Sequence, residues 1–302
     1  SGPAGLSCAY YLALKGYPVT VFEKEEKPGG MLTLGIPSFR LGRDVVNAEI
    51  DVLKELGVEF RCGVEVGRDV TLDSLRADGY KAFCLGIGAS MGTAVGCKGD
   101  DLAGVYTGID FLKAVNLDKT PEIGKKTVVI GGGNVAIDVA RTAARLGAET
   151  TVIYRRGRDE MPADKDEVAE AEEEGVRFMF LAAPVEISGS GKCEAIRVEL
   201  MELGEADARG RRKPVGTGRY ETIEVSSVIS AIGQKIDLGG IAAFELNGSG
   251  SVRVDAKTLQ TSVPDVFAGG DAATGPKFAI DAIAAGKEAS VSIHRYVHAG
   301  QT

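Results

Sequence analysis

The sequence contains the same turn–helix–strand pattern twice, and this internal repeat limits the possible folds more than any other feature. The second copy is complete: a strand at 127–130, a glycine turn at 131–136, a helix at 137–146 and a strand at 151–153. The first copy has its turn at 1–5, its helix at 6–13 and its strand at 19–22. Aligned without gaps, Gly2 corresponds to Gly133 and Gly16 to Gly147. The repeat predicts two related α/β units in one chain.

The order of the other expected elements places the second copy inside the domain that contains the first. Before it we expect helices at 44–56 and 108–115 and strands at 58–62 and 82–85. After it we expect an acidic helix at 167–174 and strands at 177–181, 195–203 and 220–225, the last two joined in a hairpin by a polar turn at 204–218. Buried strands at 228–232 and 263–267 and a final helix at 277–297 are expected to follow. The predicted fold class is α/β, with two Rossmann-like, doubly wound domains, the second inserted into the first. We expect residues 1–105 and 229–302 to form the first domain and residues 106–228 the second. Because the first turn has no strand before it, we expect the chain to be a piece of a longer protein.

The glycine turns have the composition of dinucleotide sites. Glycine lets backbone N–H groups approach a pyrophosphate, which then lies at the positive end of the following helix. The predicted cofactor-binding residues of the two turns are Gly2, Pro3, Ala4 and Gly5 in the first, and Gly131, Gly133, Asn134, Val135 and Ala136 in the second. Glu23, with Lys24 beside it, follows the first unit's strand, where a carboxylate can accept hydrogen bonds from both ribose hydroxyls. The alternative is a plain tight turn.

The second copy replaces the acid with a basic sequence. Tyr154 occupies the position equivalent to Glu23 and is followed by Arg155 and Arg156. Loss of the acid removes repulsion toward a 2′-phosphate, and two guanidinium groups offer paired donors, to which Arg158 would add. This favours NADP(H) over NAD(H) in the second domain, whereas the alternative is a solvated turn. One unit has an acid after the strand that follows its helix, and the other has two arginines there. Together they indicate a flavin and a pyridine nucleotide, with FAD in the first domain.

Six motifs, in order along nearly the whole chain, carry a resemblance to a known family. They are residues 2–5, 29–37, 131–138, 154–156, 231–234 and 266–271. The sequence resembles the flavoproteins with two dinucleotide-binding domains, and most closely the NADPH-oxidising subunits or domains of the glutamate synthase small chain, dihydropyrimidine dehydrogenase and ferredoxin-NADP transhydrogenase type. The resemblance implies further cofactor-binding residues: Gly30, Met31, Leu32, Gly35, Ile36 and Pro37 along the flavin, Gly88 near FAD, Ala231, Gly233 and Gln234 at the crossing between domains, Gly270 and Asp271, and Phe278 and Ala279.

The resemblance also implies chemistry. Asp271 would hydrogen-bond the ribityl chain or pyrophosphate of FAD, and the start of the final helix would stabilise negative charge on the reduced flavin. The implied activity is NADPH oxidation through FAD, with electrons passed to an iron–sulfur or ferredoxin-type partner. No catalytic side chain is expected, because hydride transfer needs alignment in a dry site. The alternatives are a flavin-dependent dehydrogenase or oxidase of an organic substrate, and a non-catalytic nucleotide-binding assembly subunit.

Composition argues against several other classes of protein. A net charge of −8 argues against a nucleic-acid partner, and no apolar run is long enough for a membrane span. The five scattered cysteines form no C-x-x-C, so the sequence does not indicate a zinc knuckle, an iron–sulfur cluster or a dithiol redox pair. Scattered, reduced cysteines make the cytoplasm the expected compartment. His294 and His298 lack a third ligand, so no metal is expected. A basic stretch within the expected turn is either a docking site or a polar hairpin tip: Arg209, Arg211, Arg212 and Lys213. The acidic helix at 167–174 is expected to be a solvated face.

Overall fold

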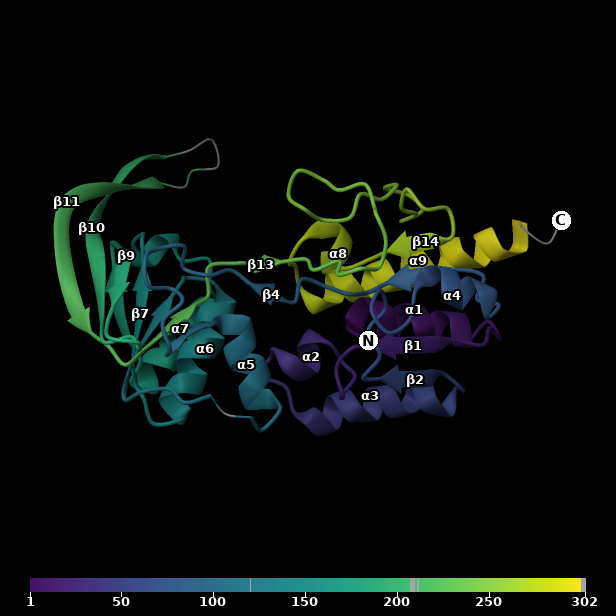
Figure 1. Ribbon diagram of the computed structural model, residues 1–302, viewed down its shortest axis with the longest axis horizontal. Coiled ribbons are helices and arrows are strands. Elements are labelled where there is room, and N and C mark those ends of the chain that lie inside the picture. Colours follow the sequence, from purple (N-terminus) through teal and green to yellow (C-terminus); the bar gives the residue numbers. More distant parts are fainter. Residues whose placement is uncertain (120, 207–209, 211, 300–302) are drawn as a thin grey trace. The chain divides into compact units, whose positions relative to one another are not determined.

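The computed structural model describes residues 1–119, 121–206, 210 and 212–299, which form two compact units (Figure 1). Unit 1 comprises residues 1–91 and the described residues from 234 onward, and unit 2 comprises residues 92–233. The chain passes between them twice, through the paired short strands β4 (Met91–Gly92) and β13 (Gln234–Lys235). The insertion of one unit into the other matches the expectation, but the divisions lie at 91/92 and 233/234 instead of 105/106 and 228/229. The reason is that Lys98 and Ala103 form β-bridges with residues 186 and 192 inside unit 2, and that β5 (Val105–Thr107) pairs with β12 (Ser227–Ser230) there.

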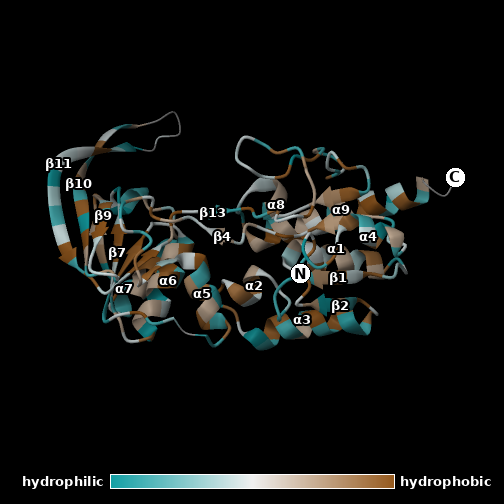
Figure 2. Cartoon of the chain, in the orientation of Figure 1, coloured by the Kyte–Doolittle hydropathy of each residue, from teal (hydrophilic) through white to brown (hydrophobic). Residues whose placement is uncertain are grey.

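Unit 2 is built on a five-stranded parallel sheet. Its strand order is β5, β12, β6 (Lys126–Ile130), β7 (Glu149–Tyr154) and β8 (Arg177–Phe180). Neighbouring residues of β6 face opposite sides, as the two-residue period of a strand requires. Val129 packs with the helices α5 (Gly108–Asn116), α6 (Asn134–Arg145) and α7 (Lys165–Glu173), whereas Val128 packs with a second sheet. Figure 2 shows the strands of this core mostly in brown, as expected for a sheet covered on both faces.

The second sheet of unit 2 is antiparallel and consists of β9 (Ala182–Ser188), β10 (Ala195–Ala206) and β11 (Arg212–Glu224). The polar turn expected at 204–218 is therefore wrong for the described residues, since 204–206 and 212–218 are strand. Leu203 pairs with Pro214, and Ala206 with Arg212, in a hairpin drawn as two long curved ribbons in Figure 1. Most of β11 is exposed, so its polar composition reflects solvent contact and not a loop. Arg209 and Arg211 lie outside the described residues.

Unit 1 places its first helix between two others. Its elements are α1 (Pro3–Ala13), β1 (Thr20–Glu23), α2 (Met31–Leu34), α3 (Arg43–Glu55), β2 (Glu59–Cys62), α4 (Leu72–Ala77), β3 (Phe83–Leu85), β14 (Val266–Ala268), α8 (Asp271–Thr274) and α9 (Ala279–Ala299). Leu6 of α1 packs with Ile50 of α3, and Cys8 packs with Ala289 of α9. β1 pairs in parallel with β2, and β3 with β14. The short helices α2, α4 and α8 were not predicted.

The repeated pattern is present in both units. α1 and α6 each follow an N-cap glycine, Gly2 and Gly133. Each helix is followed by a glycine with left-handed backbone, Gly16 at φ +83° and Gly147 at φ +93°. The ungapped alignment of the two copies is therefore confirmed at both ends of the helix.

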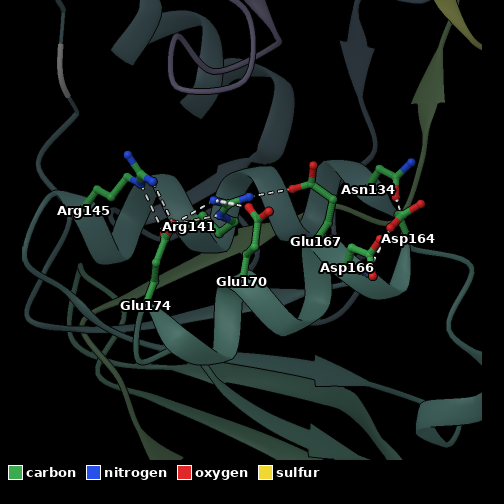
Figure 3. A network of polar contacts seen from close by, with 8 residues as sticks. All are labelled: Asn134, Arg141, Arg145, Asp164, Asp166, Glu167, Glu170 and Glu174. Atoms are coloured by element: carbon green, nitrogen blue, oxygen red, sulfur yellow. Dashed lines mark hydrogen bonds and ion pairs between the residues drawn. The ribbon is translucent and has the colours of Figure 1, made fainter.

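A buried arginine joins α6 to α7 (Figure 3). The Arg141 side chain is only 5% exposed and forms ion pairs with Glu167 at 2.6 Å, Glu170 at 2.8 Å and Glu174 at 2.7 Å. Their spacing of three and four residues puts these carboxylates on one face of α7 and its C-cap. The expectation of a purely solvated acidic face is wrong, because this face compensates a guanidinium that α6 buries.

This network predicts a pH-dependent contribution to stability. Hydrogen bonds from Arg145 lower the pKa of Glu174 to about 2, against the effect of partial burial, and Arg141 adds to the shift. A lowered pKa in the folded state stabilises the protein above the unfolded-state pKa, near 4.5, and this contribution is lost as the pH falls toward 2. We expect Glu174→Gln to reduce the free energy of unfolding by about 1 kcal/mol at pH 7, since solvent partly screens these pairs. Urea unfolding should show a smaller loss at pH 3, and equal losses at both pH values would contradict this assignment.

Candidate cofactor sites

Three backbone segments of unit 1 converge on the N-terminus of α1. A Cβ atom on Gly30 would lie 2.5 Å from the Cα of Gly2, and one on Gly86 would lie 2.8 Å from the backbone nitrogen of Gly5. A Cβ atom on Gly270 would lie 3.0 Å from the Cβ of Ala4. Approaches this close need residues without side chains, and Gly30 and Gly270 also have positive φ angles of 54° and 65°. The loops after β1, β3 and β14 therefore form a glycine cradle around this helix end.

The cradle is suited to an anion. The N-cap Gly2 offers no side-chain hydrogen bond, and the first turn of α1 contains no acidic residue. The first N–H groups of a helix have no partner within the helix, and its dipole is positive at this end. A pyrophosphate fits both requirements.

Glu23 ends β1 beside this turn, as the sequence predicts. Its side chain is 11% exposed. The Ser1 hydroxyl donates to Glu23 Oε2 at 2.5 Å, and the backbone N–H of Glu25 donates to Oε1 at 2.9 Å. The Gly29 N–H donates in turn to Ser1 Oγ at 3.0 Å, which links the strand end to the glycine cradle. Lys24, the next residue, is exposed.

The segment expected beside the flavin is a compact turn held by an arginine that the sequence did not single out. Arg43, at the start of α3, donates from Nη1 to the carbonyl of Leu32 and from Nη2 to the carbonyl of Ile36, both at 2.6 Å. The close contact of Gly35 with Met31 adds to the packing, since a Cβ on Gly35 would lie 2.0 Å from the Met31 side chain. Pro37 follows, and its carbonyl accepts the N–H groups of residues 40 and 41. Arg43 thus closes the segment 31–37.

The remaining predicted residues of unit 1 follow its strands. Asp271 opens α8, and burial raises the pKa of its carboxyl group, although the Lys277 N–H donates to it at 3.1 Å. Gly88 has φ +65° and open space where a side chain would lie. Ala279 is the first residue of α9, and Phe278 before it is 71% exposed.

The glycine turn of unit 2 connects β6 to α6. A Cβ on Gly131 would lie 2.4 Å from the Ala231 carbonyl oxygen, and one on Gly132 would lie 2.5 Å from the Tyr154 ring. Gly133 caps α6 without a side-chain hydrogen bond and has open space around it. Figure 3 shows Asn134 beside Asp164, whose N–H donates to the Asn134 Oδ1 at 2.9 Å. Val135 is partly buried and Ala136 is fully buried in the core of this unit.

The residues expected to bind a 2′-phosphate follow β7. Tyr154 is buried, and its hydroxyl donates to the carbonyl of Glu160 at 2.9 Å. Arg155 is exposed, whereas Arg156 is half-buried. Arg158, expected to add to them, pairs here with Glu172 and stacks over two phenylalanine rings, Phe178 and Phe180. An acidic residue on α7 and partly buried rings on β8 hold its guanidinium.

The residues expected at the crossing lie where the chain leaves unit 2. The Ala231 N–H donates to the Ile130 carbonyl at 2.7 Å, and the Gly233 carbonyl accepts the Thr93 N–H at 3.1 Å. Gln234 then begins β13. The crossing thus includes two hydrogen-bonded strands, β4 and β13.

The two histidines of α9 both lie near the hydroxyl group of one tyrosine. The Tyr17 hydroxyl lies 2.7 Å from Nδ1 of His294 and 3.4 Å from Nδ1 of His298. Among the described residues no group of three or more histidine, cysteine, aspartate or glutamate side chains could hold a metal ion. No helix in the described part of the chain has the length and apolarity to cross a membrane.

Comparison with known proteins assigns this architecture to a family. Residues 1–286 match the pyridine nucleotide-disulphide oxidoreductase family, and the chain belongs to it. The whole chain is 45% identical to the NADP(+)-dependent formate dehydrogenase subunit beta of Moorella thermoacetica. The glutamate synthase [NADPH] small chain of Escherichia coli is 36% identical to this chain. The alignment covers 98% of this chain and 67% of that protein. The predicted resemblance and oxidoreductase class are thereby confirmed.

The solved structures confirm the fold class. Mycobacterium tuberculosis FprA in complex with NADPH matches all of this chain and 84% of its own, with a TM-score of 0.85 at 20% identity. At that identity the likeness is one of fold alone. The chain spans only 44% of the length of the formate dehydrogenase subunit.

Proposed function

We propose that unit 1 holds FAD, that unit 2 binds NADP(H), and that the chain oxidises NADPH through the flavin. The observation that carries the proposal is the pair of glycine turns, one followed by a buried acid and the other by two arginines. In unit 1, the cradle and α1 would hold the pyrophosphate, and Glu23 the adenosine ribose. In unit 2, the turn before α6 would hold the second pyrophosphate, with Arg155 and Arg156 at the 2′-phosphate.

FAD would supply the chemistry that accepts a hydride and releases electrons one at a time. The protein's own residues would bind and orient the two nucleotides. Asp271 lies next to Gly270, at the same helix end as the Gly2 turn, and its carboxylate fits an acceptor for the ribityl hydroxyl groups. Arg43 would keep segment 31–37 in place beside the ring.

We further propose an iron–sulfur or ferredoxin-type acceptor for the electrons and the cytoplasm as the compartment. The names of the relatives support an acceptor outside this chain, since these proteins are a subunit beta and a small chain. The net charge of −8 gives no support to a nucleic-acid partner.

The test is anaerobic mixing of the FAD-loaded protein with NADPH. We expect the absorption band of the oxidised flavin to disappear with one equivalent of NADPH per flavin, because one hydride carries the two electrons that reduce FAD. NADH at the same concentration should react much more slowly. Failure of both nicotinamides to reduce the flavin would overturn the proposal.

A further inference from the structure

The loop that follows β7, residues 155–160, is held from outside by the β10–β11 hairpin. Arg156 Nε donates to the backbone carbonyl of Arg212 on β11 at 3.0 Å. The Arg212 guanidinium pairs with the carboxylate of Glu160, from Nε at 2.7 Å and also from Nη2. On the other strand, the Leu203 side chain lies 3.7 Å from the position that a Cβ on Gly157 would take. Both strands of the hairpin therefore contact the loop.

The backbone of the same loop is hydrogen-bonded to one residue, Leu181, which lies between the two sheets of unit 2 in the sequence. The Leu181 N–H donates to the Arg156 carbonyl at 3.1 Å, and the Leu181 carbonyl accepts the Met201 N–H at 2.7 Å. Leu181 connects β8 to β9, and Met201 belongs to β10. The backbone of Arg156 is thus hydrogen-bonded to Leu181, and its side chain is hydrogen-bonded to the hairpin.

Glu160 is a buried carboxylate that depends on Arg212. Its side chain is 10% exposed, and Oε1 makes the pair with Arg212. Oε2 is buried and has no hydrogen-bond partner among the described residues. Removing the partner of a buried charge is costly and leaves that charge uncompensated. Here the uncompensated charge would be negative and would lie on the loop expected to receive a phosphate.

We propose that Arg212 is a specificity-determining positioning residue for the 2′-phosphate of the coenzyme. Its pair with Glu160 holds the hairpin against the loop, and this fixes the carbonyl that orients Arg156. With Nε engaged there, the two Nη groups of Arg156 are the donors that remain for a bidentate phosphate contact. The pair also neutralises Glu160, so that Arg155 and Arg156 determine the local charge. This inference rests on the proposed binding of NADP(H) by unit 2.

The test compares two small probes on the full chain by titration calorimetry: adenosine 2′,5′-bisphosphate, which carries the 2′-phosphate, and 5′-AMP, which lacks it. We expect Arg212→Ala to weaken bisphosphate binding about tenfold and to change 5′-AMP binding less than twofold. Arg219→Ala is the matched control, because Arg219 lies on the same strand, carries the same charge and is 69% exposed opposite Glu202 at 3.9 Å. Arg212→Lys should restore most of the bisphosphate affinity, since lysine can still pair with Glu160.

The outcomes separate this inference from the function on which it rests. If the unaltered chain binds the bisphosphate no more tightly than 5′-AMP, the assignment of NADP(H) to unit 2 fails, and the inference fails with it. If the unaltered chain prefers the bisphosphate but Arg212→Ala keeps that preference, only the role of Arg212 is overturned. Equal losses in Arg212→Ala and Arg219→Ala would also overturn it, because general charge would then explain the effect.

Discussion

Replacing Arg155 and Arg156 together with alanine is expected to lower kcat/KM for NADPH by about 100-fold and to change kcat/KM for NADH less than threefold. Each guanidinium lost removes hydrogen bonds to a doubly charged phosphate, and bonds to charged groups are the stronger class. NADH has a hydroxyl at the same position, so it loses little. The measurement is steady-state reduction of ferricyanide by the FAD-loaded protein with each coenzyme.

A matched control removes two cations from the opposite end of the same sheet. Lys125 and Lys126 stand at the start of β6, whereas the glycine turn follows its end. The double alanine variant of these lysines should leave the preference for NADPH over NADH unchanged. If the Arg155 and Arg156 variant loses equal activity with both coenzymes, the loop does not recognise a 2′-phosphate, and the plain solvated turn becomes the better interpretation.

The parts of this fold that could be predicted are those determined by neighbouring residues. Gly2 and Gly133 cap their helices, and Gly16 and Gly147 follow them, because a cap or a left-handed turn needs glycine at a fixed place in the sequence. The buried strand β6 was visible as an uninterrupted apolar run, which parallel strands require. Local chemistry of this kind repeats, and the repeat could be recognised from the turn, helix and strand that the two copies share.

The hairpin shows how exposure conceals a strand. β11 spans Arg212–Glu224, but the sequence predicted a strand only at 220–225. Residues 212–219 are mostly exposed, so no alternation of polar and apolar residues marks them. Glycines at 216 and 218 strengthened the appearance of a turn. The strand forms because β10 supplies its hydrogen-bonding partner, and this partner cannot be deduced from the composition of β11 alone.

The partners of three arginines could not be assigned from sequence for a different reason. Arg43 contacts a carbonyl 11 residues away, Arg141 a glutamate 26 residues away, and Arg156 a carbonyl 56 residues away. A long flexible side chain gives no periodic signal, and tertiary packing decides which partner it reaches. Sequence reasoning therefore named residues expected to touch the nucleotides but did not single out Arg43 or Glu160, and it named Arg212 only as part of a basic stretch.

The second large effect is expected at the contact between α1 and α9. Gly286 lies within α9, and a Cβ there would lie 2.1 Å from the carbonyl oxygen of Ala4 and 2.9 Å from the Cβ of Ser7. Ser7 Oγ also donates to the Ile283 carbonyl at 2.8 Å, so the two helix backbones are held together at this point. We expect Gly286→Ala to reduce the free energy of unfolding by about 3 kcal/mol, because overpacking against backbone atoms cannot be relieved by a rotamer change.

In a helix without close neighbours, replacing glycine with alanine would instead increase the free energy of unfolding by up to about 1 kcal/mol. Gly5→Ala is therefore the informative control: Gly5 is in α1, and nothing lies within 4 Å of the Cβ it would gain. Thermal unfolding of the flavin-free protein should show a lower Tm for Gly286→Ala and an unchanged or higher Tm for Gly5→Ala. FAD binding should weaken in Gly286→Ala as well, since α9 can make room only by displacing the end of α1 that the glycine cradle surrounds. An unchanged Tm in Gly286→Ala would mean that the two helices separate at little cost, and the position of α1 would then not depend on this contact.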